Sequence, residues 1–242
     1  MKSARVLGLV LLVALPACSG DRRTTYFADG QRCSEITFDE GVPDGTWRTW
    51  YANGQAESKS HYEHGREIGT WQSWFEDGKP LSVSEYAAGL PTGTWGFWYA
   101  NGQKAAEGSY VAGRREGVWR EWFADGKPRF EGPFVAGKEH GVLKTWYESG
   151  KRQSTLRYWE GKAHGVSKTW FESGKLKSER SFSFGSQEGR ALQFWESGQR
   201  RSIGAMAQSR KDGPWSFWNE DGSLDTELSG DYSADVRVAV PQ

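Results

Sequence analysis

The sequence predicts an all-β protein: an elongated, open, single-layer antiparallel sheet of about nine tandem β-hairpins. The main observation is a glycine that recurs every 24 residues with no insertion or deletion, at Gly45, Gly69, Gly93, Gly117, Gly141, Gly165, Gly189 and Gly213. Aromatic residues and Asn-Gly or Asp-Gly pairs recur at fixed distances from this glycine, and no stretch has a sustained helical period. Such a repeat array is first of all a scaffold or a binding surface.

Each copy, numbered from its recurring glycine as position 0, has the features of one β-hairpin. Positions 2 to 6 are rich in aromatic residues and favour a strand, because bulky rings pack well on a pleated surface. The pair at positions 8 and 9, such as Asn53-Gly54, predicts a type I′ turn. A second strand then runs to an aromatic residue at position 17, such as Tyr62. A glycine at position 20 and a basic residue after it, such as Gly65 and Arg66, make the connection to the next copy.

Tryptophan is used far more than in an ordinary protein, and the repeat explains where it lies. The chain has 14 Trp residues, and all but Trp159 occupy repeat positions. Ring stacking between neighbouring copies is therefore the expected cohesive contact, because a single sheet has no thick core. A carbohydrate-stacking platform is the alternative use of the same rings. The formal net charge is +0 and the basic residues are scattered, which argues against nucleic-acid binding.

Residues 1–17 have the features of a lipoprotein signal peptide. Lys2 and Arg5 form a basic region, and the apolar segment that follows is too short to span a bilayer comfortably. Residues 15–18 resemble a bacterial lipobox, in which Cys18 is acylated and becomes the new N-terminus. Multiple acyl chains on this cysteine would give a stable membrane anchor.

Acylation of the lipobox cysteine would divide the mature chain into three parts. Residues 18–20 would be a short tether, residues 21–230 the repeat array and residues 231–242 a C-terminal tail or cap. Cys33 would then be the one remaining thiol; a plain secretory signal is the alternative, and would leave the two cysteines free to pair. By resemblance to Gram-negative lipoproteins, Ser19 in place of Asp implies sorting to the outer membrane.

The sequence contains no motif for catalysis, a cofactor or a metal, and predicts a protein that is not an enzyme. It has no phosphate-binding loop, nucleophile elbow or metal-binding helix. His140 and His164 hold equivalent positions in neighbouring copies, about 10 Å apart by strand spacing, so a shared metal would need further ligands. His61 and His64 are expected in solvent. Repeated carboxylates at position 7 are expected to form a solvated edge.

Departures from the repeat are where function is expected, because a binding residue should break a structural pattern. Three successive copies lack the large ring at position 2, where Leu143, Ser167 and Ala191 stand between Trp119 and Trp215. These five residues predict a shallow groove between two Trp-bearing ridges, in which a partner strand, a lipid or a glycan would lie. The alternative is drift in a tolerant repeat. The lysines at position 3 of two of these copies would face the opposite side of a regular strand.

The repeat unit resembles the bacterial MORN-repeat variant. Its pattern is Gly-x-Trp-x-x-Trp-Tyr/Phe-x-Asn/Asp-Gly, followed by Tyr-x-x-Gly-Lys/Arg-x-x-Gly as in residues 110–117 and 158–165. The resemblance covers residues 21 to about 230. Proteins of this family are often described as YwqK-like antitoxins, and many carry lipoprotein signals. Their MORN relatives are linked to membrane association, protein scaffolding and phospholipid contact.

The resemblance and the leader together predict a membrane-anchored, non-catalytic repeat scaffold in the bacterial cell envelope, at the outer membrane. Its β-surface would bind a protein or another envelope macromolecule, with no cofactor and no nucleic acid. One alternative is an antitoxin-like protein that neutralises a partner toxin. Another is a module that binds glycan, peptidoglycan or phospholipid.

Overall fold

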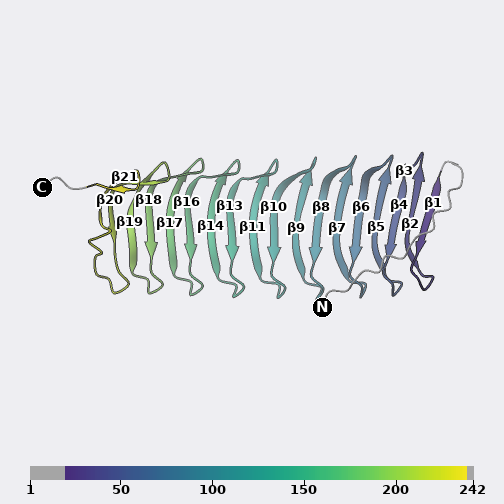
Figure 1. The fold of residues 1–242 in the computed structure, drawn as a ribbon, viewed down its shortest axis with the longest axis horizontal. Coiled ribbons are helices and arrows are strands. Elements are labelled where there is room, and N and C mark those ends of the chain that lie inside the picture. Colours follow the sequence, from purple (N-terminus) through teal and green to yellow (C-terminus); the bar gives the residue numbers. More distant parts are fainter. Residues whose placement is uncertain (1–19, 239–242) are drawn as a thin grey trace. The chain divides into compact units, whose positions relative to one another are not determined.

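The computed structural model describes residues 20–238, so the proposed signal peptide and Cys18 lie outside the described residues. Within this range every regular element is a β-strand, and the strands pair antiparallel. The part of the chain that is described accordingly contains no helix suited to crossing a membrane. The prediction of an all-β, open antiparallel sheet of tandem hairpins is confirmed. The labelled elements of Figure 1 are all strands. The chain divides into two compact units, Met1–Arg114 and Arg115–Gln242.

The first unit is an open sheet in which successive strands pair in chain order. The two-residue strand β3 and the next strand both pair with β2, because Asp44 interrupts the chain between them. The strands are β1 (Asp21–Tyr26), β2 (Arg32–Asp39), β3 (Val42–Pro43), β4 (Gly45–Trp50), β5 (Ala56–Glu63), β6 (Arg66–Trp74), β7 (Pro80–Ala87), β8 (Leu90–Trp98) and β9 (Lys104–Val111).

The second unit repeats the same hairpins and ends in a short extra one. Its last strands, β21 and β22, continue the pairing beyond β20, so residues 230–237 extend the sheet. The strands are β10 (Arg114–Trp122), β11 (Pro128–Val135), β12 (Lys138–Glu139), β13 (Gly141–Trp146), β14 (Arg152–Trp159), β15 (Lys162–Ala163), β16 (Gly165–Trp170), β17 (Leu176–Ser183), β18 (Ser186–Phe194), β19 (Arg200–Ala207), β20 (Arg210–Phe217), β21 (Gly230–Ser233) and β22 (Val236–Arg237).

The tight two-residue turn of each copy lies at positions 19 and 20. Between β7 and β8, Ala88 and Gly89 have φ angles of 49° and 82°. Two successive positive φ angles are the geometry of a type I′ turn, whose twist matches that of the flanking strands. The same pair of positive φ angles recurs along both units, with His64 and Glu160 among the non-glycine residues at its first place.

The prediction of a type I′ turn at Asn53-Gly54 is wrong, because only Gly54 has a positive φ, 83°. The N–H of Gly54 donates to the carbonyl of Tyr51, and the N–H of Tyr51 donates to the carbonyl of Gln55, both at 2.9 Å. These bonds define a type I turn closed by a left-handed glycine, which is a three-residue loop with a bulge. The Asn53 side chain accepts the N–H of Gln55 at 2.9 Å, which explains the preference for Asn, Asp or Ser there.

Rings at positions 2 and 17 stack into a continuous ladder on one face of the first unit. Its half-buried rings follow one another with centroids 4.8 to 6.1 Å apart, in the order Trp47, Tyr62, Trp71, Tyr86, Trp95 and Tyr110. Tilted ring pairs at such distances contribute about 0.5–1.5 kcal/mol each beyond their burial. The expected stacking between neighbouring copies is therefore present in this unit.

In the second unit, a compact cluster of buried side chains lies near the C-terminal end. Ala191, Trp215 and Tyr232 are its buried members, and Met206 and Phe217 pack against them. Trp215 and Phe217 stack with centroids 5.6 Å apart. Because Tyr232 belongs to β21, the final hairpin covers the last rings of the repeat.

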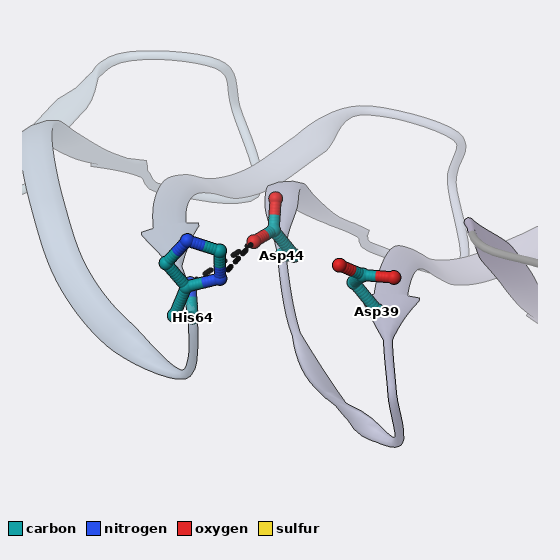
Figure 2. A group of neighbouring side chains, drawn as sticks. All are labelled: Asp39, Asp44 and His64. Carbon is teal, nitrogen blue, oxygen red and sulfur yellow. Dashed lines mark hydrogen bonds and ion pairs between the residues drawn. The ribbon is translucent and has the colours of Figure 1, made fainter.

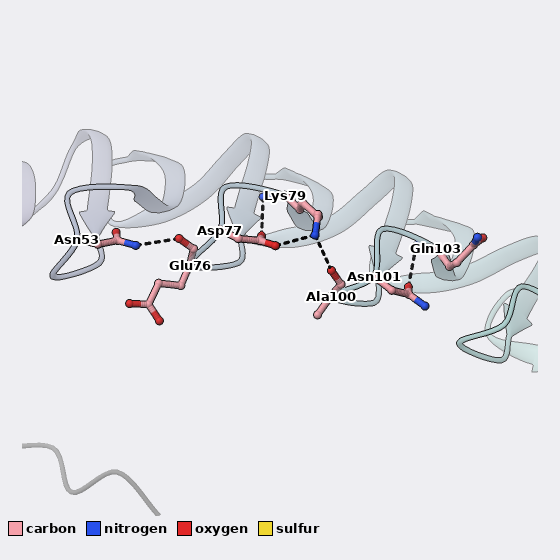
Figure 3. A network of polar contacts seen from close by, with 7 residues as sticks. All are labelled: Asn53, Glu76, Asp77, Lys79, Ala100, Asn101 and Gln103. Atoms are coloured by element: carbon pink, nitrogen blue, oxygen red, sulfur yellow. Dashed lines mark hydrogen bonds and ion pairs between the residues drawn. The ribbon is translucent and has the colours of Figure 1, made fainter.

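Polar contacts join successive copies of the first unit along the edge that carries the long turns (Figure 3). Asn53 Nδ2 donates to the Glu76 carbonyl at 2.9 Å, and Lys79 Nζ donates to the Ala100 carbonyl at 3.3 Å. Lys79 also pairs with Asp77 at 2.7 Å. The polar residues of these turns therefore hold neighbouring copies together, as well as closing their own loops.

Candidate functional site

The five residues of the predicted groove are all buried in the second unit. Their exposed fractions are 4% for Trp119, 8% for Leu143, 5% for Ser167, 3% for Ala191 and 5% for Trp215. A groove that receives a partner would need open surface at these positions. The loss of three rings therefore leaves no open groove at these residues.

Neighbouring side chains fill the space of the missing rings. A Cβ on Gly204 would overlap the Trp215 ring, and a Cβ on Gly132 would collide with Leu143. The side chain at position 2 thus lies over position 15 of the preceding copy. Since each such pair shares one space, a large residue at one position favours a small one at the other.

The two positions change together along the chain. Within the units, the pairs of position 15 and the following position 2 are Ser60 and Trp71, Ser84 and Trp95, Gly132 and Leu143, Leu156 and Ser167, Arg180 and Ala191, and Gly204 and Trp215. Trp47 follows the larger Ile36, and its Nε1 is buried without a hydrogen-bond partner among the described residues. In contrast, Trp71 Nε1 donates to the carbonyl of His61. A change of size at position 15 therefore compensates for the loss of the large ring at position 2.

The lysines at position 3 of these copies lie on the other face of the sheet and are ion-paired there. Lys144 Nζ lies 2.9 Å from Glu131, and Lys168 Nζ lies 2.9 Å from Glu179. The hydrogen bond from Lys144 is the main cause that lowers the pKa of Glu131. These lysines are therefore already ion-paired within the sheet and are poor candidates for binding a ligand.

A hollow of about 720 Å³ opens in the second unit beside Arg180, and we call it the Arg180 hollow. Three cations line it: Lys177 and Arg180 from β17, and Arg201 from β19. Glu196 and Glu220 add two carboxylates. Pockets that bind small ligands have volumes of about 300–1,000 Å³, so this hollow is of ligand size.

Two of these cations lie over aromatic rings that also line the hollow. Lys177 Nζ is 5.3 Å from the Phe171 ring centroid, and the Arg201 guanidinium is 4.5 Å from that of Trp195. Such contacts attract the cation to the ring face and restrict where the charge lies. The rings therefore position the charges without neutralising them.

The third cation, Arg180, stands at position 15, where the first unit has Ser60 and Ser84. It pairs across the sheet with Ser167 on one side and Ala191 on the other. Arg180 Nε and Ser167 Oγ are buried, and neither has a hydrogen-bond partner within residues 20–238. Within the same residues none of the three cations has an ion pair, whereas Arg129 at a neighbouring hollow pairs with Glu121 at 3.1 Å.

Exposed apolar side chains gather along the tight turns of the second unit. Val135, Trp159 and Phe184 are exposed by 49%, 49% and 60%, and we call them the tight-turn edge. The rings of Trp159 and Phe184 lie 4.4 and 4.7 Å from those of His140 and His164. A hollow of about 370 Å³ beside Trp159 is lined by both histidines. In the sequence, the feature that indicates this surface is Trp159, the one Trp outside the repeat positions.

Asp39, Asp44 and His64 form a cluster in the first unit, with ligand atoms within 4.8 Å of one another (Figure 2). Asp44 Oδ2 accepts the N–H of His64 at 3.0 Å and lies 3.4 Å from its Nδ1. Glu116 makes the same contact in the second unit, where it accepts the N–H of Ala136 at 2.8 Å. The carboxylate at this position thus holds the following tight turn, a role that needs no histidine and no ion.

A family model described as MORN repeat variant matches six segments that together make up more than half of the chain. The segments are residues 43–64, 67–88, 91–112, 115–136, 139–160 and 163–183. No curated protein gives a significant match. The matched segments follow the 24-residue period and leave out the copy that begins at Gly189, in which positions 2 and 5 both lack Trp. The chain therefore belongs to the MORN repeat variant family.

Proposed function

We propose that this protein is a lipid-anchored, non-catalytic scaffold of the bacterial cell envelope that binds a protein partner through its tight-turn edge. The scaffold role is supported by the use of the repeated residues. Glycines form the turns, rings stack between copies, and turn side chains bond to the next copy. An array built in this way offers a rigid surface whose copies contact only their neighbours.

The observation that carries the binding role is the exposure of Val135, Trp159 and Phe184 along one edge. Large apolar side chains that are exposed together mark interaction sites on soluble surfaces. Tryptophan is also among the residues that dominate binding energy at protein interfaces. The hollow beside Trp159 would receive an apolar side chain of the partner.

Site-directed photo-crosslinking tests this role in cells. A photo-reactive amino acid at Trp159 or Phe184 is expected to give a discrete crosslinked protein band. The matched control is the same amino acid at Glu172, an exposed residue of a long turn. The proposal fails if the two edge positions give no band, or if Glu172 gives the same band.

The lipid anchor is proposed from the lipobox-like residues that end at Cys18. Palmitate labelling of cells that express Cys18→Ser should lose the signal, and the protein should leave the membrane fraction. Cys33→Ser is the matched control and should label normally, because Cys33 lies in strand β2. Unchanged labelling of Cys18→Ser would show that Cys18 carries no acyl chain.

A further inference from the structure

We propose that the Arg180 hollow binds a sugar acid, that is, a hydroxyl-rich glycan unit with a single carboxylate. This site shares no lining residue with the hollow beside Trp159. It is therefore a second binding function, independent of the protein partner at the tight-turn edge.

The charges of the hollow fit one carboxylate. Its three cations, Lys177, Arg180 and Arg201, and its two carboxylates, Glu196 and Glu220, leave a net charge of +1. A highly charged polyanion would meet both carboxylates and be repelled by them. A ligand with one negative charge is matched, and its remaining polar groups would have to be neutral.

The other polar groups of the hollow fit hydroxyls. The amides of Gln153 and Gln193 offer both donors and acceptors, while Glu196 and Glu220 offer acceptors only. A sugar hydroxyl both donates and accepts, so it is satisfied by this mixture. A simple carboxylate ligand would use the cations and leave the acceptors of the hollow without donors.

Arg180 is the group that would hold the carboxylate. Its guanidinium presents parallel donors in the planar fork that matches a carboxylate in bidentate fashion. Among the described residues, its Nε is buried without a hydrogen-bond partner, and so is Ser167 Oγ on the paired strand. Buried polar groups of this kind are normally satisfied by a protein group, water or ligand. At the same position in the first unit, Ser60 and Ser84 carry no charge.

Calorimetric titration of the full-length chain in detergent micelles tests the site. The probes are the methyl glycoside of galacturonic acid, which carries one carboxylate, and the methyl ester of the same sugar, which carries no charge. The acid is expected to bind about tenfold more tightly or better, the ratio expected for a charge-assisted hydrogen bond. Arg180→Gln should abolish this preference, so that acid and ester bind alike. Arg190→Gln, an exposed arginine of strand β18 that lines neither hollow, is the matched control and should keep the preference.

Three results would overturn the proposal. One is absence of binding by both probes, and another is equal binding of acid and ester by the unmodified chain. The third is binding of propionate, a simple monocarboxylate, as tight as that of the sugar acid, which would indicate a general carboxylate site. Circular dichroism checks the strand signal of each variant. If Arg180→Gln loses the strand signal, the variants Lys177→Gln and Arg201→Gln are titrated in its place. A preference for the acid over the ester that survives in both of these variants counts against the site.

Discussion

Local backbone strain is concentrated at the first residue of each tight turn. Ala88 and Ala112 have φ of 49° and 47° there, and both are followed by a glycine. A residue with a Cβ in the left-handed region is less stable by roughly 1–2 kcal/mol. Alanine has no polar side chain that would bond locally and offset this strain. These positions therefore reduce the stability of an otherwise regular hairpin.

Replacement of Ala88 by glycine should stabilise the protein. Ala88→Gly removes the left-handed strain, offset in part by the greater freedom of glycine in the unfolded chain, for a net gain of about 1 kcal/mol. Ala106→Gly is the matched control within strand β9 and should instead lower stability by about 0.5–1 kcal/mol. Urea unfolding measures both. Equal losses in the two variants would show that the turn is not strained.

Stability should fall as the pH drops through the titration of His61. Burial, followed by the charges of Lys59 and Arg48, lowers the pKa of this half-buried histidine below 6.5. Its Nδ1 lies 3.1 Å from Thr46 Oγ1, so the expectation that it lies free in solvent is wrong. Because the unfolded chain binds the proton first, the stabilisation is complete above about pH 6.5 and is lost as the pH falls through the folded pKa.

The His61 prediction is checked by urea unfolding between pH 7.5 and 5.5. The free energy of unfolding should decrease across this range, and His61→Gln should show a smaller decrease because it removes the titrating group. The lower limit stays above the ordinary pKa range of the carboxylates. An equal decrease in His61→Gln would mean that other groups cause the pH dependence.

At the scale of strands and turns, the sequence predicted the strands well and the turn type poorly. Aromatic runs and the aromatic at position 17 fall within or beside strands, as for Trp50 and Tyr62. The pair Asn53-Gly54 fits both a type I′ turn and a type I turn closed by glycine. Hydrogen bonding from Tyr51 to Gln55 decides between them, and this depends on strand register rather than on the pair itself.

The opposite sizes of the residues at positions 15 and 2 predict that a large residue introduced at one position can be offset by a small one at the other. Ala191→Trp should destabilise the second unit by about 1–3 kcal/mol, because Ala191 is only 3% exposed and pairs with the large side chain of Arg180. Adding Arg180→Ser should recover much of the loss, since Ser84 and Trp95 form the same combination in the first unit. Urea unfolding of the two single variants and the double variant measures this coupling. If the double variant is no more stable than Ala191→Trp, the two positions do not share one space.

At the scale of the whole molecule, the period predicted the array but could not locate the binding surfaces. The period shows which residues are structural, and it drew attention to Ser167 and Ala191 because they break it. Both breaks are explained by packing against the preceding copy, which a comparison limited to position 2 does not reveal. Arg180 indicates a binding surface more strongly than Ser167 or Ala191, because it is the one charged residue at position 15 of the repeat. The hollow around it combines side chains from several copies, so no single motif encodes it.

The ladder of the first unit predicts that one whole period can be removed. Deletion of residues 69–92 joins Ile68 to Gly93 and keeps every position in register. Trp95 would then take the place of Trp71 over Ser60 and stack on Tyr62.

The variant that lacks residues 69–92 should retain a cooperative urea transition and the strand signal in circular dichroism. Its denaturant slope should be smaller, because less surface is exposed on unfolding. Deletion of residues 69–80 is the control: it removes half a period, brings a second strand where a first strand belongs, and should abolish the cooperative transition. If both deletions unfold alike, the copies are not interchangeable units stabilised by their neighbours, and the nearest-neighbour account of this fold is incorrect.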